Sequence, residues 1–278
     1  MNASVATRNP SLPTGARARM SGLYALKPWF TARLTPIVGA AVARQISPDA
    51  FTVAGVVAGA AAGVFVAFGW WPLAAVFLVL RLAGANLDGA VARARAVSRP
   101  WGFVVNEIGD RAADLLAFAG LAVWAARQSG PGLDWLSWPV LQVVIAALAA
   151  TLPTFASLAA AAAGATRRNG GPLGKTERCL FVVVATALPG LMPILLVQIV
   201  NGSVITTVLR LRGAHRELAA QRATPPEARQ ALPQRPPGVV LVERVEAVTQ
   251  PLNLVTQPLN LVTQPLHVGP RHRVGVAA

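Results

Sequence analysis

Apolar segments separated by short polar stretches dominate this sequence. The segments run over roughly residues 51–69, 72–87, 103–126, 136–164, 177–189 and 192–210. A helix needs about 20 apolar residues to cross a bilayer, and most of these segments come close to that length. The fifth is short and ends at Pro189-Gly190, so its boundary with the sixth is the least defined. The pattern predicts an all-α, polytopic membrane protein with six transmembrane helices.

The segment before the first apolar run mixes aromatic, aliphatic and cationic side chains. Residues 23–44 include Trp29, Phe30 and Arg33. Such a mixture is typical of an amphipathic helix that lies in the membrane interface. Ser47-Pro48 then indicates a helix start, with serine as the N-cap and proline at the first helical position. We therefore expect an N-terminal interfacial amphipathic helix on the inner leaflet, followed by the first membrane span.

Cationic loops set the expected orientation in the membrane. Arginines and lysines gather in residues 93–99, 167–178 and 210–216, whereas the opposite side carries Trp70-Trp71 and an isolated Arg127. Loops rich in Lys and Arg stay on the cytoplasmic side of a membrane. We expect both termini in the cytoplasm and a chain that is integral to the inner (cytoplasmic) membrane.

The two ends of the chain differ from the membrane domain expected over residues 23–216. Residues 1–22 are polar and contain proline and arginine, which predicts a disordered N-terminus. Residues 217–278 are Pro-rich, and the heptapeptide V-T-Q-P-L-N-L recurs there. A proline in every repeat rules out a coiled coil, so we expect a disordered tail that arose by duplication. Docking of a partner on the tail is the less favoured alternative.

Composition narrows the class of protein. The chain is 54% hydrophobic and 13% charged, which excludes an ordinary soluble domain. The net charge of +14 lies in short loops and in the tail, not on a basic face interleaved with aromatic residues. We therefore expect membrane lipids and phosphate-bearing substrates as partners, and no nucleic acid. The single cysteine, Cys179, excludes an intramolecular disulfide and a multi-cysteine metal site.

Carboxylates at the mouths of two apolar segments are the candidate chemistry. Asp88 lies near the end of the second segment, and Asn106, Asp110 and Asp114 repeat every four residues in the third. That spacing places the last three on one helix face. Ionisable side chains within membrane spans are rare and usually functional. Two such faces turned toward each other would form an oxygen-lined cage at the cytoplasmic end of a helix pair.

These residues resemble the signature of the CDP-alcohol phosphatidyltransferases, D-x-x-D-G-x-x-A-R-x8-G-x3-D-x3-D. Ala85 and Asn106 stand where the family has its first and third aspartates. The other six fixed positions match, and they are Asp88, Gly89, Ala92, Arg93, Gly102 and Asp110. A divergent bacterial branch of the family is similar in carrying N-E-x-G-D, as residues 106–110 do here. The resemblance therefore implies a bacterial membrane enzyme.

The resemblance implies transfer of a phosphatidyl (substituted phosphate) group from a CDP-alcohol, usually CDP-diacylglycerol, to an acceptor alcohol. CMP is released, and the reaction belongs to phospholipid biosynthesis. Paired Mg²⁺ or Mn²⁺ ions fit an all-oxygen site of this kind. By resemblance Asp88 is a metal ligand, and Asp110 is the general base and a further ligand. Asn106 and Glu107 are the remaining candidate ligands. A homodimer is implied by analogy with known members.

Substrate-binding residues follow from the same resemblance. Gly89 leaves room for the nucleotide, Arg93 offers a planar fork to phosphate, and Ala92 and Gly102 occupy the remaining matched positions. Thr52 ends a segment similar to the family's P-N-x-x-T, in which Asp49 replaces the asparagine. Lys175 and Arg178 resemble a basic stretch that faces an acceptor phosphate. The alternative is that the positive-inside rule alone explains those two cations.

Several structural alternatives remain open at this point. Asp88 with Arg93, and Asp110 with Arg111, could be plain ion pairs, and Asp114 could pair with a neighbouring helix or serve as a spare ligand. Because Ala85 and Asn106 are not aspartates, a catalytically degenerate CDP-lipid-binding or scaffold protein is the main functional alternative. A transporter is less favoured, since the chain shows no repeated halves. Glycerol phosphate, inositol phosphate, serine or another alcohol could be the acceptor.

Overall fold

A computed structural model describes residues 26–130 and 132–223 of the chain, and these residues form helices without a β-strand. The predicted disorder of residues 1–22 and the heptapeptide tail lie outside the described residues. The helices are α1 (Lys27–Arg33), α2 (Thr35–Ala43), α3 (Pro48–Ala67), α4 (Trp71–Ala94), α5 (Pro100–Gln128), α6 (Trp138–Ala162), α7 (Lys175–Ala187), the 3-10 turn η2 (Pro189–Leu191) and α8 (Met192–Ala223).

Proline defines the beginnings of the helices. Each helix from α1 to α6 has a proline at its first or second position, where the missing N–H costs nothing and the fixed φ favours the helix. Ser47 has the extended backbone of an N-cap before α3, as expected, but its side chain makes no capping hydrogen bond. The helix start therefore depends on Pro48 more than on the serine.

The helices from α3 onward correspond to the six apolar segments. Four of the described helical stretches are long and apolar enough to cross a bilayer, and they are α3, α4, α6 and the η2–α8 stretch. Helix α5 is long but carries the charged residues Glu107, Asp110, Arg111 and Asp114. Helix α7 has only 13 residues. The chain therefore has the helices of a membrane protein, whereas the count of six spans stays a prediction.

Two boundaries differ from the sequence-based expectation. The single N-terminal helix expected over residues 23–44 is two short helices, α1 and α2, which meet at the buried Leu34. Pro36 lies in the first turn of α2 and restarts the helix there. Helix α8 continues to Ala223, beyond the domain boundary expected after residue 216. The location of α1 and α2 at a membrane interface stays a prediction.

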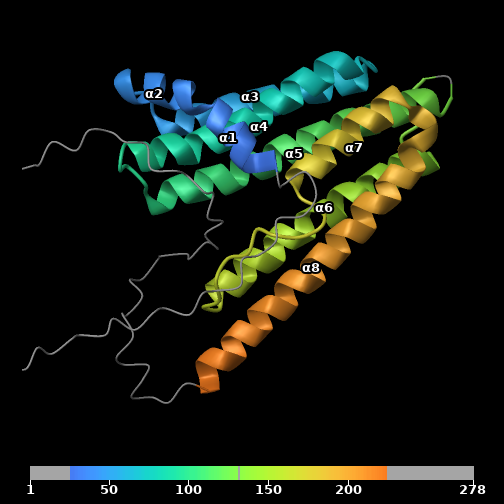
Figure 1. The fold of residues 1–278 in the computed structure, drawn as a ribbon. Helices are drawn as coiled ribbons and strands as arrows, with labels where there is room; N and C mark the ends of the chain where they lie inside the picture. Colours follow the sequence, from blue (N-terminus) through green and yellow to red (C-terminus); the bar gives the residue numbers. More distant parts are fainter. Residues whose placement is uncertain (1–25, 131, 224–278) are drawn as a thin grey trace, which may run out of the picture. The chain divides into compact units, whose positions relative to one another are not determined.

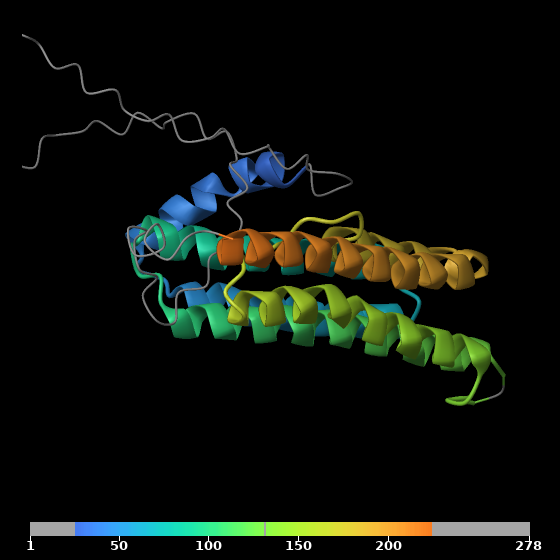
Figure 2. The same cartoon turned by 90° about the horizontal axis from the view of Figure 1, so that it is seen from below.

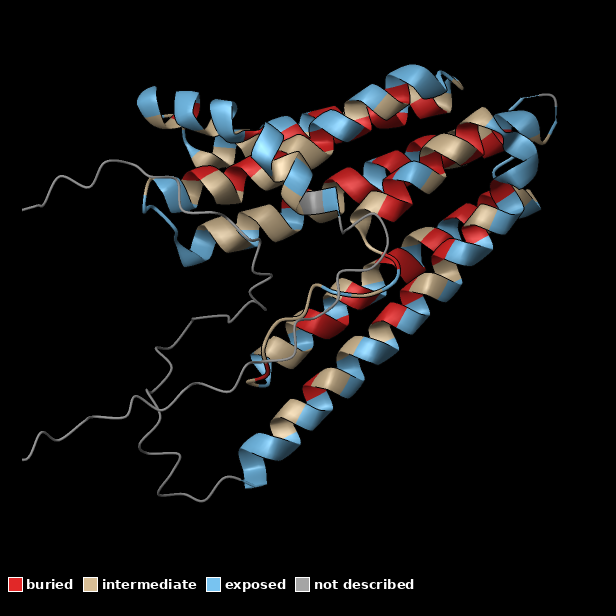
Figure 3. Ribbon diagram, viewed as in Figure 1, coloured by how far each residue is buried: buried red, intermediate tan, exposed pale blue. Residues whose placement is uncertain are grey.

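Helices α3, α4 and α5 pack against one another, α6 packs along α8, and α7 contacts α4, α5 and α8 (Figures 1 and 2). Buried residues line the inner faces of these helices, and exposed residues cover their outer faces (Figure 3). Many of the exposed side chains are large and apolar, among them Val57, Leu148 and Phe155. An apolar outer surface is what a lipid environment favours.

Glycines bring α3 and α5 into backbone contact. A Cβ added at Gly59 would lie 2.7 Å from the Cβ of Ala113. A Cβ at Gly63 would overlap the carbonyl of Leu116, and one at Gly120 would overlap the carbonyl of Gly63. Small residues at four-residue spacing allow such close helix approach in membranes, where tight packing replaces the hydrophobic effect as the source of stability.

We predict that Gly120→Val destabilises the fold, because its side chain has no room beside the α3 backbone. Overpacking of this kind costs roughly 1–3 kcal/mol, which lowers the melting temperature in detergent by several degrees. Gly39→Val on α2 is the matched control, since nothing lies within 4 Å of an added Cβ there. Equal melting temperatures for the two variants would show that α3 and α5 are not in backbone contact.

Candidate active site

All the site residues expected from the sequence line a single cavity of about 1030 Å³, namely Thr52, Asp88, Gly89, Ala92, Arg93, Gly102, Asn106, Glu107, Asp110, Lys175 and Arg178. The cavity lies where the end of α4 meets the beginnings of α3, α5 and α7. Residues of the α6–α7 connection, including Arg167 and Asn169, complete the wall. The N-termini of three helices therefore face one space, which favours anions there.

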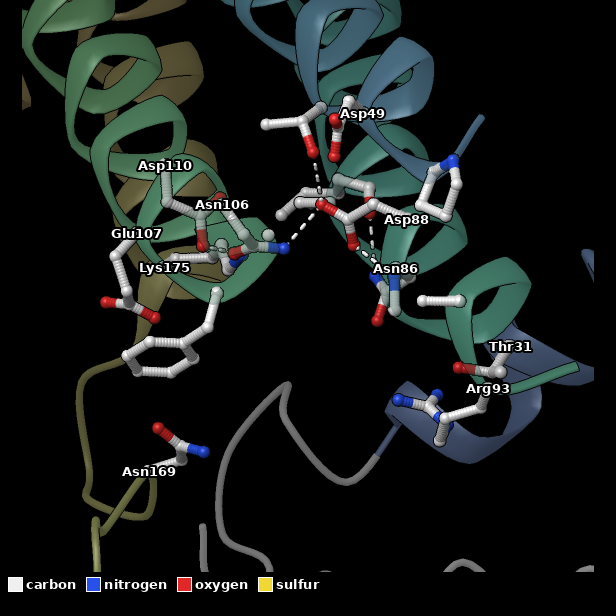
Figure 4. A pocket seen from close by; sticks show the side chains of 18 of the residues that line it. Thr31, Asp49, Asn86, Asp88, Arg93, Asn106, Glu107, Asp110, Asn169 and Lys175 are labelled. Carbon is white, nitrogen blue, oxygen red and sulfur yellow. Dashed lines mark hydrogen bonds and ion pairs between the residues drawn. The ribbon is translucent and has the colours of Figure 1, made fainter. Parts of the chain in front are cut away.

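Asp88 is the best-supported carboxylate of the cavity. It is buried, with 5% exposure. The hydroxyl of Thr52 on α3 donates to its Oδ2 at 3.0 Å, and the amide Nδ2 of Asn106 on α5 donates to the same oxygen (Figure 4). The backbone N–H of Gly89 donates to Oδ1 at 2.5 Å. Donors from three helices thus hold one carboxylate at the cavity wall.

Arg93 lies against the backbone of Gly89 and not on Asp88. A Cβ added at Gly89 would lie 3.1 Å from Nη1 of Arg93, so glycine leaves room for the guanidinium. No ion pair joins Asp88 to Arg93 among the residues that the structure describes, so that structural alternative is wrong. In Figure 4 Arg93 lies apart from the Asp88–Asn106 pair, at another part of the cavity wall.

Asp110 pairs across the cavity with α7. Nζ of Lys175 lies 2.6 Å from Oδ2 of Asp110, and the two side chains are 29% and 16% exposed. The alternative pairing of Asp110 with Arg111 is wrong, because the Arg111 guanidinium lies 3.1 Å from Asp114. Asp88 and Asp110, the two matched aspartates of the signature, therefore have different surroundings: neutral donors at Asp88 and an ammonium at Asp110.

Glu107 contacts the α6–α7 connection. Its Oε1 forms an ion pair with Nη2 of Arg167, and the Arg167 guanidinium also lies 5.2 Å from the centre of the Phe103 ring. The same connection is tied to α8, where the Arg210 guanidinium donates to the carbonyls of Pro153, Asn169 and Gly170. Glu107 lines the cavity as expected, but its carboxylate is already paired with Arg167 of this connection.

A buried charge cluster lies one helical turn deeper along α5. Asp114 is 6% exposed and accepts from Arg81 on α4 at 2.5 Å and from Arg178 on α7 at 2.6 Å, and it forms an ion pair with Arg111 at 3.1 Å. Asp114 therefore pairs with neighbouring helices, and this alternative is confirmed. Arg178 reaches the cavity wall, but its guanidinium is engaged with Asp114.

Arg81 is the residue that the sequence reasoning missed. Its side chain is 1% exposed and also donates to the backbone carbonyl of Asp110 at 3.1 Å and to Sγ of Cys179 at 3.5 Å. The signal was present, since Arg81 is the only charged residue in the apolar run over residues 72–87. An arginine inside a membrane segment indicates a buried partner.

The oxygen donors of the cavity fit one hard divalent cation. Asp88 supplies two carboxylate oxygens, and a half-turn of the Asn106 amide, whose Nδ2 donates to Asp88 in this structure, would present its carbonyl oxygen to the same space. Asp110 faces them from the next turn of α5 (Figure 4). The described residues contain no group of three or more His, Cys, Asp and Glu that could hold a metal together. The donor set is therefore smaller than that of a site with four aspartates.

The sequence of this chain is similar to those of known proteins. The family model for CDP-alcohol phosphatidyltransferase matches residues 45–211. Phosphatidylinositol phosphate synthase of Streptomyces avermitilis is 29% identical over 244 residues, covering 82% of this chain and 96% of the relative. The enzyme of the same name from Mycolicibacterium smegmatis is 31% identical over 178 residues, covering 62% and 76%.

Two crystal structures of Mycobacterium tuberculosis phosphatidylinositol phosphate synthase resemble the fold, each with a TM-score of 0.55 and 25% identity. One has CDP-DAG bound, and the match covers 65% of this chain and 92% of that chain. The other is in complex with manganese and citrate, and the match covers 65% and 88%.

We predict that Asp114→Asn strongly destabilises the protein, because it leaves three guanidinium groups without their carboxylate. Breaking a buried ion pair by removing one partner costs about 3–5 kcal/mol. Thermal unfolding in detergent measures the loss. Asp134→Asn, in the exposed α5–α6 connection, is the control and should unfold like the wild type. If the two variants melt together, the cluster contributes little to stability.

Proposed function

The chain belongs to the CDP-alcohol phosphatidyltransferase family, and on that premise we propose that it transfers a phosphatidyl group from CDP-diacylglycerol to a phosphorylated alcohol. One observation carries the proposal. The matched residues of the signature, which are divided between α4 and α5, line one cavity together with Thr52 on α3 and Lys175 on α7. A related structure has CDP-DAG bound, which supports the choice of donor.

The charges of the cavity support an anionic acceptor. Its wall includes eight arginine and lysine side chains and four aspartate and glutamate side chains, so cations such as Arg93 remain after Lys175 has paired with Asp110 and Arg167 with Glu107. The relatives are named phosphatidylinositol phosphate synthases, a name that implies a product with an additional phosphate. Inositol phosphate is therefore the first acceptor to test, ahead of glycerol phosphate and serine.

The residues of the cavity that match the signature have separate parts in the proposed reaction. The acceptor hydroxyl loses its proton to the Asp110 carboxylate, its oxygen bonds to the lipid-bearing phosphorus, and the bond to the CMP phosphate breaks. The ion pair with Lys175 holds the Asp110 carboxylate in position until the hydroxyl arrives. Arg93 and the helix N-termini bind the pyrophosphate, and Gly89 leaves room for the Arg93 guanidinium. Thr52 orients Asp88.

A divalent cation suits this site, as the manganese complex of a related structure indicates. Asp88 and Asn106 are the residues that would hold it, with Asp110 facing them, and Mg²⁺ and Mn²⁺ both accept such oxygen ligands. When bound, the cation neutralises charge on the pyrophosphate. Glu107 is the less suitable ligand, because its carboxylate already pairs with Arg167.

We propose that the six helices α3 to α8 all cross the membrane, with α7 continued by η2 and α8. Apart from Arg127, the charges of α5 lie in the half of the helix that begins at the cavity, and basic residues of the connections line the same cavity. The positive-inside rule then places the cavity and both termini in the cytoplasm, where nucleotides are available. The bacterial relatives support the inner membrane of a bacterium as the location.

Release of CMP by the purified protein tests the proposed reaction. We expect acceptor-dependent CMP from CDP-diacylglycerol in the presence of Mn²⁺ or Mg²⁺, with inositol phosphate the best of a panel of alcohols. Asp110→Asn should lower the rate by about 10²–10⁴-fold, since that is the usual contribution of a general base. Asp134→Asn is the matched control. Bound CDP-lipid without CMP from any acceptor would favour the degenerate binding protein instead.

We predict that Arg93→Lys raises the KM for CDP-diacylglycerol by about tenfold or more. A planar fork is replaced by a point charge, and one charge-assisted hydrogen bond is worth roughly 1.5–3 kcal/mol. Steady-state kinetics with varied CDP-diacylglycerol measure the change. Arg127→Lys, at the far end of α5, is the control. An unchanged KM in the Arg93 variant would remove Arg93 from the pyrophosphate site.

A further inference from the structure

We infer that this active site holds one divalent cation, and that the ammonium of Lys175 on Asp110 stands in the place of a second one. The inference rests on the proposed function, because it concerns the same cavity. It goes beyond the family signature, whose four aspartates suit paired cations. Three observations support it: the charge of the carboxylates, the missing ligand at Ala85 and the surroundings of Asp110.

The cavity carries too few carboxylates for two divalent cations. Of the four signature positions, only Asp88 and Asp110 are acidic here, and Glu107 is bound to Arg167. Two divalent cations bring four positive charges, whereas these two aspartates bring two negative ones. A single divalent cation and the Lys175 ammonium already bring three positive charges to the same pair, and a second divalent cation would bring five. Excess positive charge in a site of low dielectric is costly, so the second cation would bind weakly.

The space beside Ala85 does not compensate for the missing side chain. A small cavity of about 10 Å³ lies there, lined by Ala85, Asp88, Asn106 and Asp110. That volume is at the lower limit for one water molecule. Ala85 also lines the large cavity, where its methyl group offers no ligand to a cation. Arg81, one helical turn before Ala85, also lines this small cavity. A metal ion in this position would meet a buried guanidinium.

Asp110 already has a compact cation as its partner. Lys175 is the first residue of α7, and its Nζ lies 2.6 Å from the Asp110 carboxylate. The helix start is fixed, because the Glu177 carboxylate accepts from the backbone N–H of Gly174 at 2.9 Å. Arg178 on the next turn is bound to Asp114. Lys175 is thus presented to Asp110 by an anchored helix end and not by a free surface loop.

The two cations would divide the cavity between them. A divalent cation on Asp88 and Asn106 occupies the α4 side, and the Lys175 ammonium occupies the α7 side. An ammonium is a strongly hydrated point charge with three donors, so it can approach a phosphate oxygen much as a metal ion does. The competing view is that Lys175 leaves Asp110 when substrate arrives, and a second metal ion replaces it.

Counting bound Mn²⁺ on the full-length purified protein tests the inference without turnover. Free Mn²⁺ is measured by electron paramagnetic resonance during a titration, first with the protein alone and then with CDP-diacylglycerol in the micelles. We expect one Mn²⁺ per chain in both titrations. Two Mn²⁺ per chain in either titration, including a second that binds only with CDP-diacylglycerol, would overturn the inference.

A variant that restores the carboxylates supplies the positive test. The triple variant Ala85→Asp, Asn106→Asp, Lys175→Gln should bind two Mn²⁺, and the double variant that keeps Lys175 should bind the second at least tenfold more weakly. Lys175→Gln alone should still bind one. A single Mn²⁺ in a triple variant that elutes and melts like the wild type would contradict the role of Lys175.

The metal count separates this inference from the proposed reaction. If the wild type binds one Mn²⁺ but releases no CMP, the proposed function fails and the inference stands. If it releases CMP and binds two Mn²⁺, the function stands and the inference fails. A triple variant that does not fold leaves the wild-type titrations as the deciding measurement.

Discussion

A single buried carboxylate, Asp114, is the constraint on which the cavity depends. It meets guanidinium groups from α4, α5 and α7, and Arg81 and Arg178 are almost completely buried beside it. Charges cannot be left unpaired among apolar helices, so these three helices are stable only in the arrangement that brings the arginines to Asp114. The remaining side chains of the cavity take their positions from this arrangement.

The contacts between α5 and α7 show how the buried ion pairs of Asp114 also position residues at the cavity wall. Asp114 with Arg178, and Asp110 with Lys175, form two successive ion pairs between the same helices, about one turn apart on each. Because helical side chains three or four residues apart share a face, the deeper pair fixes the register of the outer one. Arg81 adds a bond to the Asp110 carbonyl, so α4 is held at the same level and Asp88 comes to face Asn106.

The spacing of residues along the sequence predicted the helices and the residues of the cavity. It did not predict the contacts between residues that are far apart in the chain. The apolar segments predicted helices α3 to α8, and the fixed gaps of the signature located the residues of the cavity. The pairing of Glu107 with Arg167, and of Asp110 with Lys175, joins residues that are 60 and 65 positions apart, which no local pattern specifies. Arg81 was visible as a lone charge in an apolar run, but its partner on α5 was not. The break between α1 and α2 depends on Pro36 and the burial of Leu34, a matter of packing that composition does not reveal.

The replacement of two aspartates by Ala85 and Asn106 also has a kinetic consequence. A nucleotide pyrophosphate that approaches four ionised aspartates is repelled until metal ions have bound, so metal must precede nucleotide. Here the approaching anion meets Asp88 and Asp110 only, and Lys175 and Arg93 lie on the same cavity wall. The electrostatic barrier to encounter is correspondingly lower. On the proposed function we therefore expect nucleotide and cation to enter in either order, with turnover that depends less on the concentration of free metal ions.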